Sequence, residues 1–134
     1  KLYAKSLGID DSIEFLTNLP FDEMIGYLKR ATIGLHTMRD EHFGIGIVEL
    51  MAAGLITVAH NSGGPRADII KKDSGFLCTS ASEYSQTILK IIEMTSEDRL
   101  KIAQTAKRSV LDRFCGEIFS KLFSESVKTI INEQ

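Results

Sequence analysis

Short β-type runs alternate with helix-type segments over the first 80 or so residues, and this alternation constrains the fold more than any other feature. The runs expected as strands cover 13–17, 33–37, 56–60 and 75–79, and the helix-type segments cover 22–30, 46–53 and 65–71. Strands separated by helices pair in parallel, because each helix returns the chain to the edge where the next strand starts. We therefore predict an α/β domain with a Rossmann-like parallel sheet flanked by helices.

Local signals set the ends of these segments. Asp22 is expected to be the N-cap of the first helix. Gly54 follows 46–53, where glycine commonly ends a helix, and Pro65 stands at the first-turn position that proline tolerates. The chain opens on a helix-like segment, 1–7, and reaches its first strand only afterwards. We therefore expect a single domain over 1–134 that is a fragment, with at least one strand upstream.

After Ser80 the apolar residues recur at helical spacing only. Three helices are predicted: one over 81–94, one capped by Ser96, and one that begins after Gly116. The apolar face of the last helix is formed by Ile118, Phe119, Leu122, Phe123, Val127, Ile130 and Ile131. Because burying a side chain of this size contributes about 1.5–3 kcal/mol, this helix is expected to need a partner surface.

The composition of 134 residues, with 43% hydrophobic and 25% charged, is typical of one soluble globular domain. The net charge of −2 gives no basic surplus, which argues against nucleic acid as the main partner. No apolar run approaches the roughly 20 residues that span a bilayer, and the first residues do not form a signal-peptide pattern. Cys78 and Cys115 are expected as free thiols, with a single disulfide left open.

One stretch, 41–49, combines two carboxylates with a bend that contains glycine. Glu41 follows the strand expected over 33–37, and Glu49 lies about one turn inside the next helix. Both acids would lie at the carboxyl edge of the sheet beside a helix N-terminus, where open α/β sheets bind ligands and helices hold phosphates. Ionised carboxylates only accept hydrogen bonds, which suits them to sugar hydroxyls. The stretch therefore predicts a nucleotide site, with backbone N–H groups of 43–46 facing a diphosphate.

Taken in order, the motifs resemble those of the donor-binding half of retaining GT-B glycosyltransferases of family four. These motifs are Glu41 and Glu49 around Phe43-Gly44, then Met-Ala-Ala-Gly at 51–54, then Ser-Gly-Gly at 62–64, and the resemblance covers nearly the whole chain. The longer strings 35–49 and 59–65 are similar to a branch that transfers mannose from GDP-mannose. That branch extends a dolichol-linked oligosaccharide on the cytosolic face of the endoplasmic reticulum, so membrane attachment is expected only of the full-length protein.

The resemblance implies a role for each matching position. Glu41 would be the catalytic residue that binds donor-sugar hydroxyls and stabilises an oxocarbenium-like transition state, and Glu49 would bind the ribose. Further donor contacts are expected from the backbone of Phe43, Gly44 and Ile45, from the close approach that Gly63 and Gly64 allow, and from His60. The family needs no metal at the donor site, because basic residues upstream neutralise the leaving diphosphate. Since these residues and the N-terminal acceptor domain are missing, the isolated chain is expected to bind donor weakly and to be inactive.

The residues leave other interpretations open. A related transferase could use a UDP-sugar, because the base is recognised mostly through backbone groups. A non-catalytic α/β interaction module could keep the fold without the chemistry, and Glu41 and Glu49 could then be ordinary solvated acids. An unrelated nucleotide binder lacks support, since neither G-x-G-x-x-G nor G-x-x-x-x-G-K-[ST] occurs in the chain.

Overall fold

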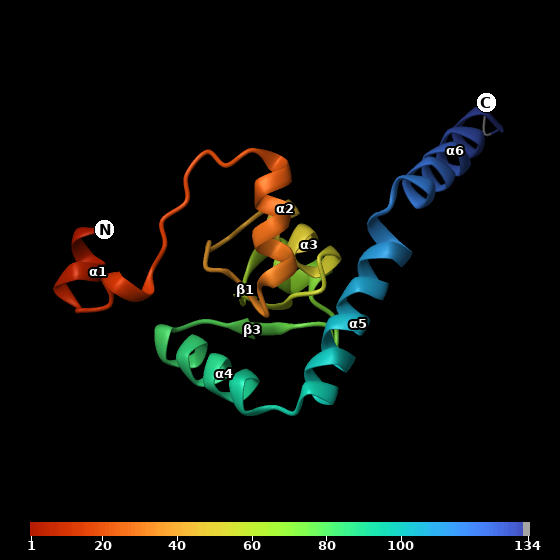
Figure 1. The fold of residues 1–134 in the computed structure, drawn as a ribbon. Coiled ribbons are helices and arrows are strands. Elements are labelled where there is room, and N and C mark those ends of the chain that lie inside the picture. Colours follow the sequence, from red (N-terminus) through yellow and green to blue (C-terminus); the bar gives the residue numbers. More distant parts are fainter. Residues whose placement is uncertain (133–134) are drawn as a thin grey trace.

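In a computed structural model, which describes residues 1–132, the chain forms a three-stranded sheet with helices on both faces (Figure 1). The elements are α1 (Leu2–Ser6), the 3-10 helix η1 (Asp10–Ser12), α2 (Phe21–Arg30), β1 (Ile33–His36), α3 (Ile45–Ala52), β2 (Ile56–His60), the π-helix η2 (Pro65–Ile69), β3 (Phe76–Cys78), α4 (Ala81–Glu93), α5 (Ser96–Phe114) and α6 (Gly116–Asn132). The predicted α/β class with three C-terminal helices is confirmed.

The sheet has the strand order β1-β2-β3, and both strand pairs are parallel. Ile33 pairs with Ile56, and Val58 pairs with Phe76. All five residues of β2 are buried, because a strand lies on each side of it and helices cover both faces. This burial explains why β2 consists mainly of apolar and β-branched residues, with Thr57 and His60 as its buried polar members. The predicted bounds of β2 are the observed ones.

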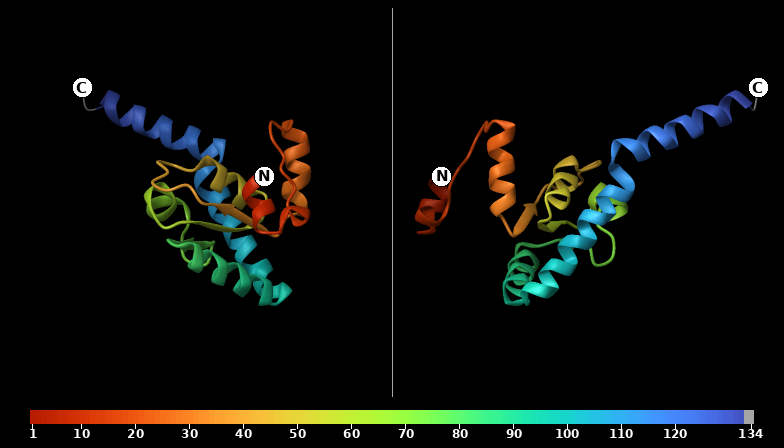
Figure 2. Two further views of the ribbon diagram at one scale, coloured as in Figure 1. Left: turned by 90° about the vertical axis from the view of Figure 1, so that its left-hand side faces the viewer. Right: turned by 45° about the vertical axis from the view of Figure 1, so that its right-hand side comes forward.

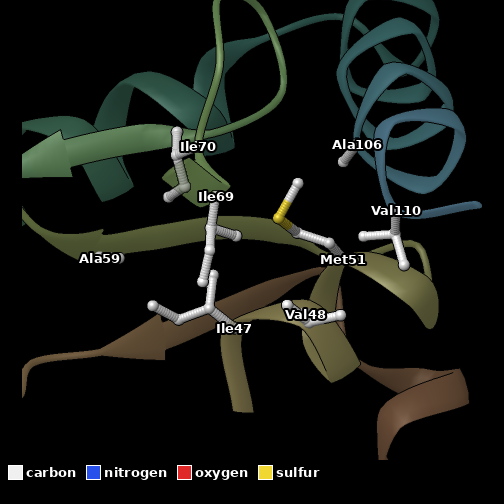
Figure 3. Packing of buried hydrophobic residues seen from close by; sticks show 8 residues of the cluster. All are labelled: Ile47, Val48, Met51, Ala59, Ile69, Ile70, Ala106 and Val110. Atoms are coloured by element: carbon white, nitrogen blue, oxygen red, sulfur yellow. The ribbon is translucent and has the colours of Figure 1, made fainter. Parts of the chain in front are cut away.

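Alternate residues of β2 divide the core between the two faces of the sheet. Ala59 belongs to the cluster drawn in Figure 3, which consists of Ile47, Val48, Met51, Ala59, Ile69, Ile70, Ala106 and Val110. Ile56 and Val58 belong to a second cluster, together with Cys78 and Ile91. Thus α3 and α5 pack on one face of the sheet and α4 packs on the other. This arrangement of helices, sheet and helix holds the carboxyl ends of β1 and β2 in place.

The segment 13–17, predicted as a strand, does not form one. A strand is defined by backbone pairing with a neighbour, and no other part of the described chain pairs with this segment. Ile13, Phe15 and Leu16 are accordingly exposed. Figures 1 and 2 show the chain between α1 and α2 running apart from the sheet.

Two predicted helix caps are also wrong. Helix α2 begins directly after its N-cap, Pro20, and Asp22 lies in the first turn, two positions beyond the cap. Helix α5 is capped by Thr95 rather than by Ser96. The Thr95 hydroxyl accepts a hydrogen bond from the Asp98 N–H at 3.1 Å. Because Asp98 stands three residues after Thr95 and its carboxylate accepts from the Thr95 hydroxyl at 2.8 Å, the pair resembles a capping box.

Helix α6 projects from the body of the molecule (Figures 1 and 2). None of its side chains up to residue 131 is buried. Its exposed apolar residues include Phe119, Leu122, Phe123, Ile130 and Ile131. Over residues 1–132, no helix has both the length and the apolar character that crossing a bilayer requires.

Candidate functional site

Two loops meet at the carboxyl edge of the sheet. Residues 37–44, the acid loop, connect β1 to α3, and residues 61–64, the glycine loop, connect β2 to η2. Because β1 and β2 are adjacent and parallel, both loops leave the sheet at the same edge. Ligands bind in open α/β sheets at this edge, so the meeting point of the two loops is the candidate site.

The two glycines of the glycine loop touch the backbone of the acid loop. The Gly64 N–H donates a hydrogen bond to the Glu41 carbonyl oxygen at 2.7 Å. A Cβ atom at Gly63 would lie 2.2 Å from that same oxygen, and one at Gly64 would lie 2.5 Å from the carbonyl oxygens of His42 and Phe43. No side chain fits at either position, so the glycine pair is what allows the loops to meet.

Gly44 forms the junction between the acid loop and α3. Its φ of +102° is a conformation that favours glycine, and its carbonyl oxygen accepts from the Ile47 N–H at 3.0 Å. The first N–H groups of a helix have no partner within it. Those of Ile45 and Gly46 therefore lie where a helix N-terminus can hold an anion, directly after the acid loop.

The Glu41 side chain is mostly buried and lies beside a histidine. Its Oε2 atom is 3.9 Å from Nε2 of His36, at the end of β1. The His36 carbonyl oxygen accepts a hydrogen bond from the Tyr84 hydroxyl at 3.1 Å, which links this strand end to α4. Burial, and secondarily the charge of the Cys78 thiol group, raise the pKa of Tyr84 above its ordinary value. Tyr84 is therefore a neutral hydroxyl donor at physiological pH.

Ser62 connects the end of β2 with the acid loop. Its Oγ atom accepts a hydrogen bond from the Asp40 N–H at 2.8 Å and lies 2.8 Å from Nδ1 of His60. The Nε2 atom of His60 and the Nδ1 atom of His36 are buried, and neither has a hydrogen-bond partner in the described part of the chain. His60 thus contacts the acid loop through Ser62, while its role as a donor contact stays a prediction.

Glu49 lies on the exposed side of α3, in a cleft of about 480 Å³ between α2 and α3. The cleft is lined by Phe21, Met24, Ile25, Leu28, Lys29, Glu49, Ala52, Ala53 and Lys107. Glu41 does not line this cleft. The structure therefore brings Glu41 together with Gly44, Gly63 and Gly64, and it places Glu49 one helical turn away on a more open surface.

The end of α5 contacts the acid loop and η2. The Phe114 ring meets the Phe43 ring edge-on, with centroids 5.6 Å apart. The Arg113 guanidinium donates to the carbonyl oxygens of Asp68 and Ile69, at the C-terminal end of η2. Phe43 and Ile45 line a second hollow of about 370 Å³ with residues of α5 and α6, so their side chains face these helices.

The sequence alone did not single out Ser62 or Arg113 as site residues. Ser62 carries a signal, because it directly precedes the glycine pair. Arg113 carries none, since its partners lie far away in the sequence and are main-chain atoms. Within residues 1–132, His, Cys, Asp and Glu side chains form no group of three or more that could hold a metal ion.

Comparison with known proteins decides the family. A sequence model of the family described as glycosyl transferases group 1 matches residues 1–109. The chain belongs to this family. The human protein GDP-Man:Man(3)GlcNAc(2)-PP-Dol alpha-1,2-mannosyltransferase is 48% identical over an alignment of 131 residues, and the match covers 95% of this chain and 26% of the human protein. The protein of the same name from Dictyostelium discoideum is 41% identical over 131 residues, 97% of this chain and 26% of that protein.

This group 1 glycosyltransferase chain thus spans about a quarter of the length of the curated relatives that it matches. Among solved structures, HepE from Anabaena in complex with UDP superposes with a TM-score of 0.85 at 26% identity. The match covers 96% of this chain and 35% of HepE. The resemblance to GT-B glycosyltransferases that the motifs indicated is confirmed.

Proposed function

We propose that this chain is the donor-binding domain of a retaining glycosyltransferase that transfers mannose from GDP-mannose to a dolichol-linked oligosaccharide. The observation that carries the proposal is the contact between the glycine pair and the Glu41 backbone at the carboxyl edge of the sheet. This contact supports the proposal because it fixes the Glu41 backbone three residues before Gly44, the N-cap of α3. A nucleotide sugar bound there would have a carboxylate to accept from its hydroxyls and N–H donors for its diphosphate. The relatives' names supply the donor, the acceptor and the α-1,2 linkage.

Each residue then acts on one part of the donor. The Glu41 carboxylate accepts hydrogen bonds from sugar hydroxyls, and its negative charge stabilises the positive charge that develops on the sugar ring in the transition state. The backbone N–H groups of Phe43, Gly44 and Ile45 bind the diphosphate. Glu49 lies one turn further along α3, about 6 Å along its axis, and accepts hydrogen bonds from the ribose hydroxyls.

The remaining parts of the reaction lie outside this chain. We propose that the donor site works without a metal ion, and that basic groups elsewhere in the protein neutralise the leaving diphosphate. The acceptor binds through another domain, and the full-length protein works on the cytosolic face of the endoplasmic reticulum membrane. The 134-residue chain by itself binds donor weakly and transfers nothing.

A second candidate donor is a UDP-sugar, which the likeness to HepE in complex with UDP favours. An NMR titration of the chain with millimolar GDP, GDP-mannose and UDP-glucose separates the candidates. We expect amide shifts at 43–49 and 62–64 that are larger for the guanine ligands. A preference for UDP-glucose would change the donor but keep the enzyme class. No shift with any ligand would mean either that upstream residues are indispensable for binding or that the module is non-catalytic, and the same titration of a longer chain extended upstream would separate the two.

Two variants test the assigned roles. Glu49→Ala should weaken GDP and GDP-mannose equally, because both carry the ribose. Glu41→Ala should weaken GDP-mannose and leave GDP unchanged, because only the former carries the sugar. Glu125→Ala, an exposed acid on α6, is the matched control and should change neither affinity. Equal losses of both ligands in Glu41→Ala would contradict the role proposed for Glu41.

A further inference from the structure

The backbone of the acid loop is held at two successive residues by the glycine loop. Ser62 Oγ accepts from the Asp40 N–H at 2.8 Å, and the Gly64 N–H donates to the Glu41 carbonyl oxygen at 2.7 Å. The second contact joins two backbone atoms, and it depends on Gly64 only because a side chain there would collide with the acid loop. The first depends on a side chain, so it is the part of this junction that a single substitution can remove without adding bulk.

Asp40 has a conformation that needs such support. Its φ of +51° lies in the left-handed region, which residues with a side chain rarely occupy. Such a conformation persists where its surroundings hold it in place. Because Asp40 immediately precedes Glu41, a change in its backbone angles would reorient the Glu41 carboxylate.

His60 holds the Ser62 hydroxyl in place. The residue is only 8% exposed, and its Nδ1 atom lies 2.8 Å from Ser62 Oγ. A hydroxyl has two lone pairs and one proton, so Ser62 Oγ can share a hydrogen bond with Nδ1 in either direction and still accept from the Asp40 N–H. The contact with His60 therefore fixes where the Ser62 oxygen lies relative to the Asp40 N–H.

From this chain of contacts we propose that Ser62 is a positioning residue that acts through Glu41, and that the pair Ser62–His60 sets the affinity for the sugar half of the donor. The inference rests on the proposed function of Glu41. The diphosphate and the ribose bind to residues 43–49, none of which Ser62 contacts through a hydrogen bond. Loss of the Ser62 hydroxyl therefore affects recognition of the sugar and not of the nucleotide.

Ser62→Ala and Ser62→Thr form the test, since threonine keeps Oγ and alanine removes it. In the ligand-free chain, the solvent-exchange rate of the Asp40 amide should rise about five- to tenfold in Ser62→Ala, the effect of losing one hydrogen bond. In NMR titrations the affinity for GDP-mannose should fall by a similar factor, while the affinity for GDP stays unchanged. Ser62→Thr should restore both quantities. Ser74→Ala, which removes another hydroxyl with local backbone hydrogen bonds, should leave both unchanged.

A double variant separates positioning from a merely structural role. If Ser62 acts through Glu41, then Ser62→Ala causes no further loss of GDP-mannose affinity in a Glu41→Gln background. An unchanged Asp40 exchange rate in Ser62→Ala would overturn the inference, and so would equal losses of GDP and GDP-mannose. If Glu41→Gln alone binds GDP-mannose as tightly as the wild type, the proposed function of Glu41 fails, and the positioning role of Ser62 fails with it. If Glu41→Gln weakens GDP-mannose as expected but Ser62→Ala weakens it further by its full single-variant factor, only the positioning role is overturned.

Discussion

Helices α5 and α6 follow one another along the chain, but only α5 is covered by the rest of the molecule. Ala106 and Val110 of α5 are buried against α3, whereas α6 buries none of its side chains up to residue 131. The apolar spacing that predicts a helix is equally clear in both. The difference shows that periodicity identifies a helix and its apolar face, while burial depends on what else the chain supplies to cover that face.

The largest expected difference in the free energy of unfolding is between two alanine substitutions, one in the core beneath α5 and one on α6. Met51 lies in the cluster between α3 and α5 with no exposed surface, so Met51→Ala should lower the free energy of unfolding by about 2–5 kcal/mol. Phe123 on α6 is 60% exposed, so Phe123→Ala should change it by less than about 0.5 kcal/mol. Urea denaturation followed by circular dichroism measures both values. Equal losses would show that α6 is covered in solution.

A matched pair of glycines extends the comparison to the backbone. In Gly64→Ala the new Cβ would lie 2.5 Å from two carbonyl oxygens of the acid loop, and we expect a loss of about 1–3 kcal/mol. Gly26, in the middle of α2, has no atom within 4 Å of a Cβ position, so Gly26→Ala should stabilise the chain by up to about 1 kcal/mol. Thermal unfolding of the two variants should therefore shift in opposite directions. A neutral Gly64→Ala would mean that the loops do not touch.

Two arginines on α5 sharpen the contrast within one helix. Arg113 is half-buried and donates to the carbonyl oxygens of Asp68 and Ile69, so Arg113→Met should cost about 1.5 kcal/mol. Among residues 1–132, Arg108 forms only an exposed ion pair with Asp112, so Arg108→Met should cost less than about 0.5 kcal/mol. Chemical denaturation compares the two, and 1 M salt should abolish the small Arg108 effect only. Similar losses in the free energy of unfolding for both variants would show that Arg113 of α5 does not stabilise η2.

The smallest expected effect concerns alkaline pH. The raised pKa of Tyr84 means that the folded chain holds the phenol proton more tightly than the unfolded chain does. Its contribution to stability is present below the ordinary tyrosine pKa of about 10 and is lost as the pH rises through the raised value. Tyr84→Phe should therefore lose less stability than the wild type between about pH 9 and about pH 11. Parallel pH profiles of the two proteins would count against this prediction.

Elements bounded by local signals could be predicted from the sequence. The β-type run 56–60, bounded by Gly54 before it and by the glycine loop after it, gives β2 its observed bounds. Helix α3 ends where Gly54, with a φ of +86°, stops it. The segment 13–17 has the same β-type residues, but a strand also needs a neighbour, and that requirement is not encoded locally. The helix caps at Asp22 and Ser96 were wrong by one or two positions, because several adjacent residues can cap.

The residues of the candidate site that belong to sequence motifs could be predicted, and those outside the motifs could not. The motif placed Glu41 and the glycine pair on loops at one sheet edge, which follows from strand order and from parallel pairing. The role of Ser62 depends on the backbone of Asp40, and that of Arg113 depends on two carbonyl groups of η2. Such contacts between a side chain and distant main chain leave no pattern in the sequence, because any residue supplies the partner atom.

The position of β1 has a consequence for handling the protein in solution. Among residues 1–132, β1 pairs only with β2, which leaves one row of its backbone donors and acceptors open. Edge strands are usually protected by charged residues or proline, and the sequence Ile33-Gly-Leu-His36 has neither, while Leu35 is exposed. We therefore expect the chain to associate edge to edge as its concentration rises. Light scattering should increase steeply in the millimolar range, and a lysine introduced at Leu35 should delay this self-association.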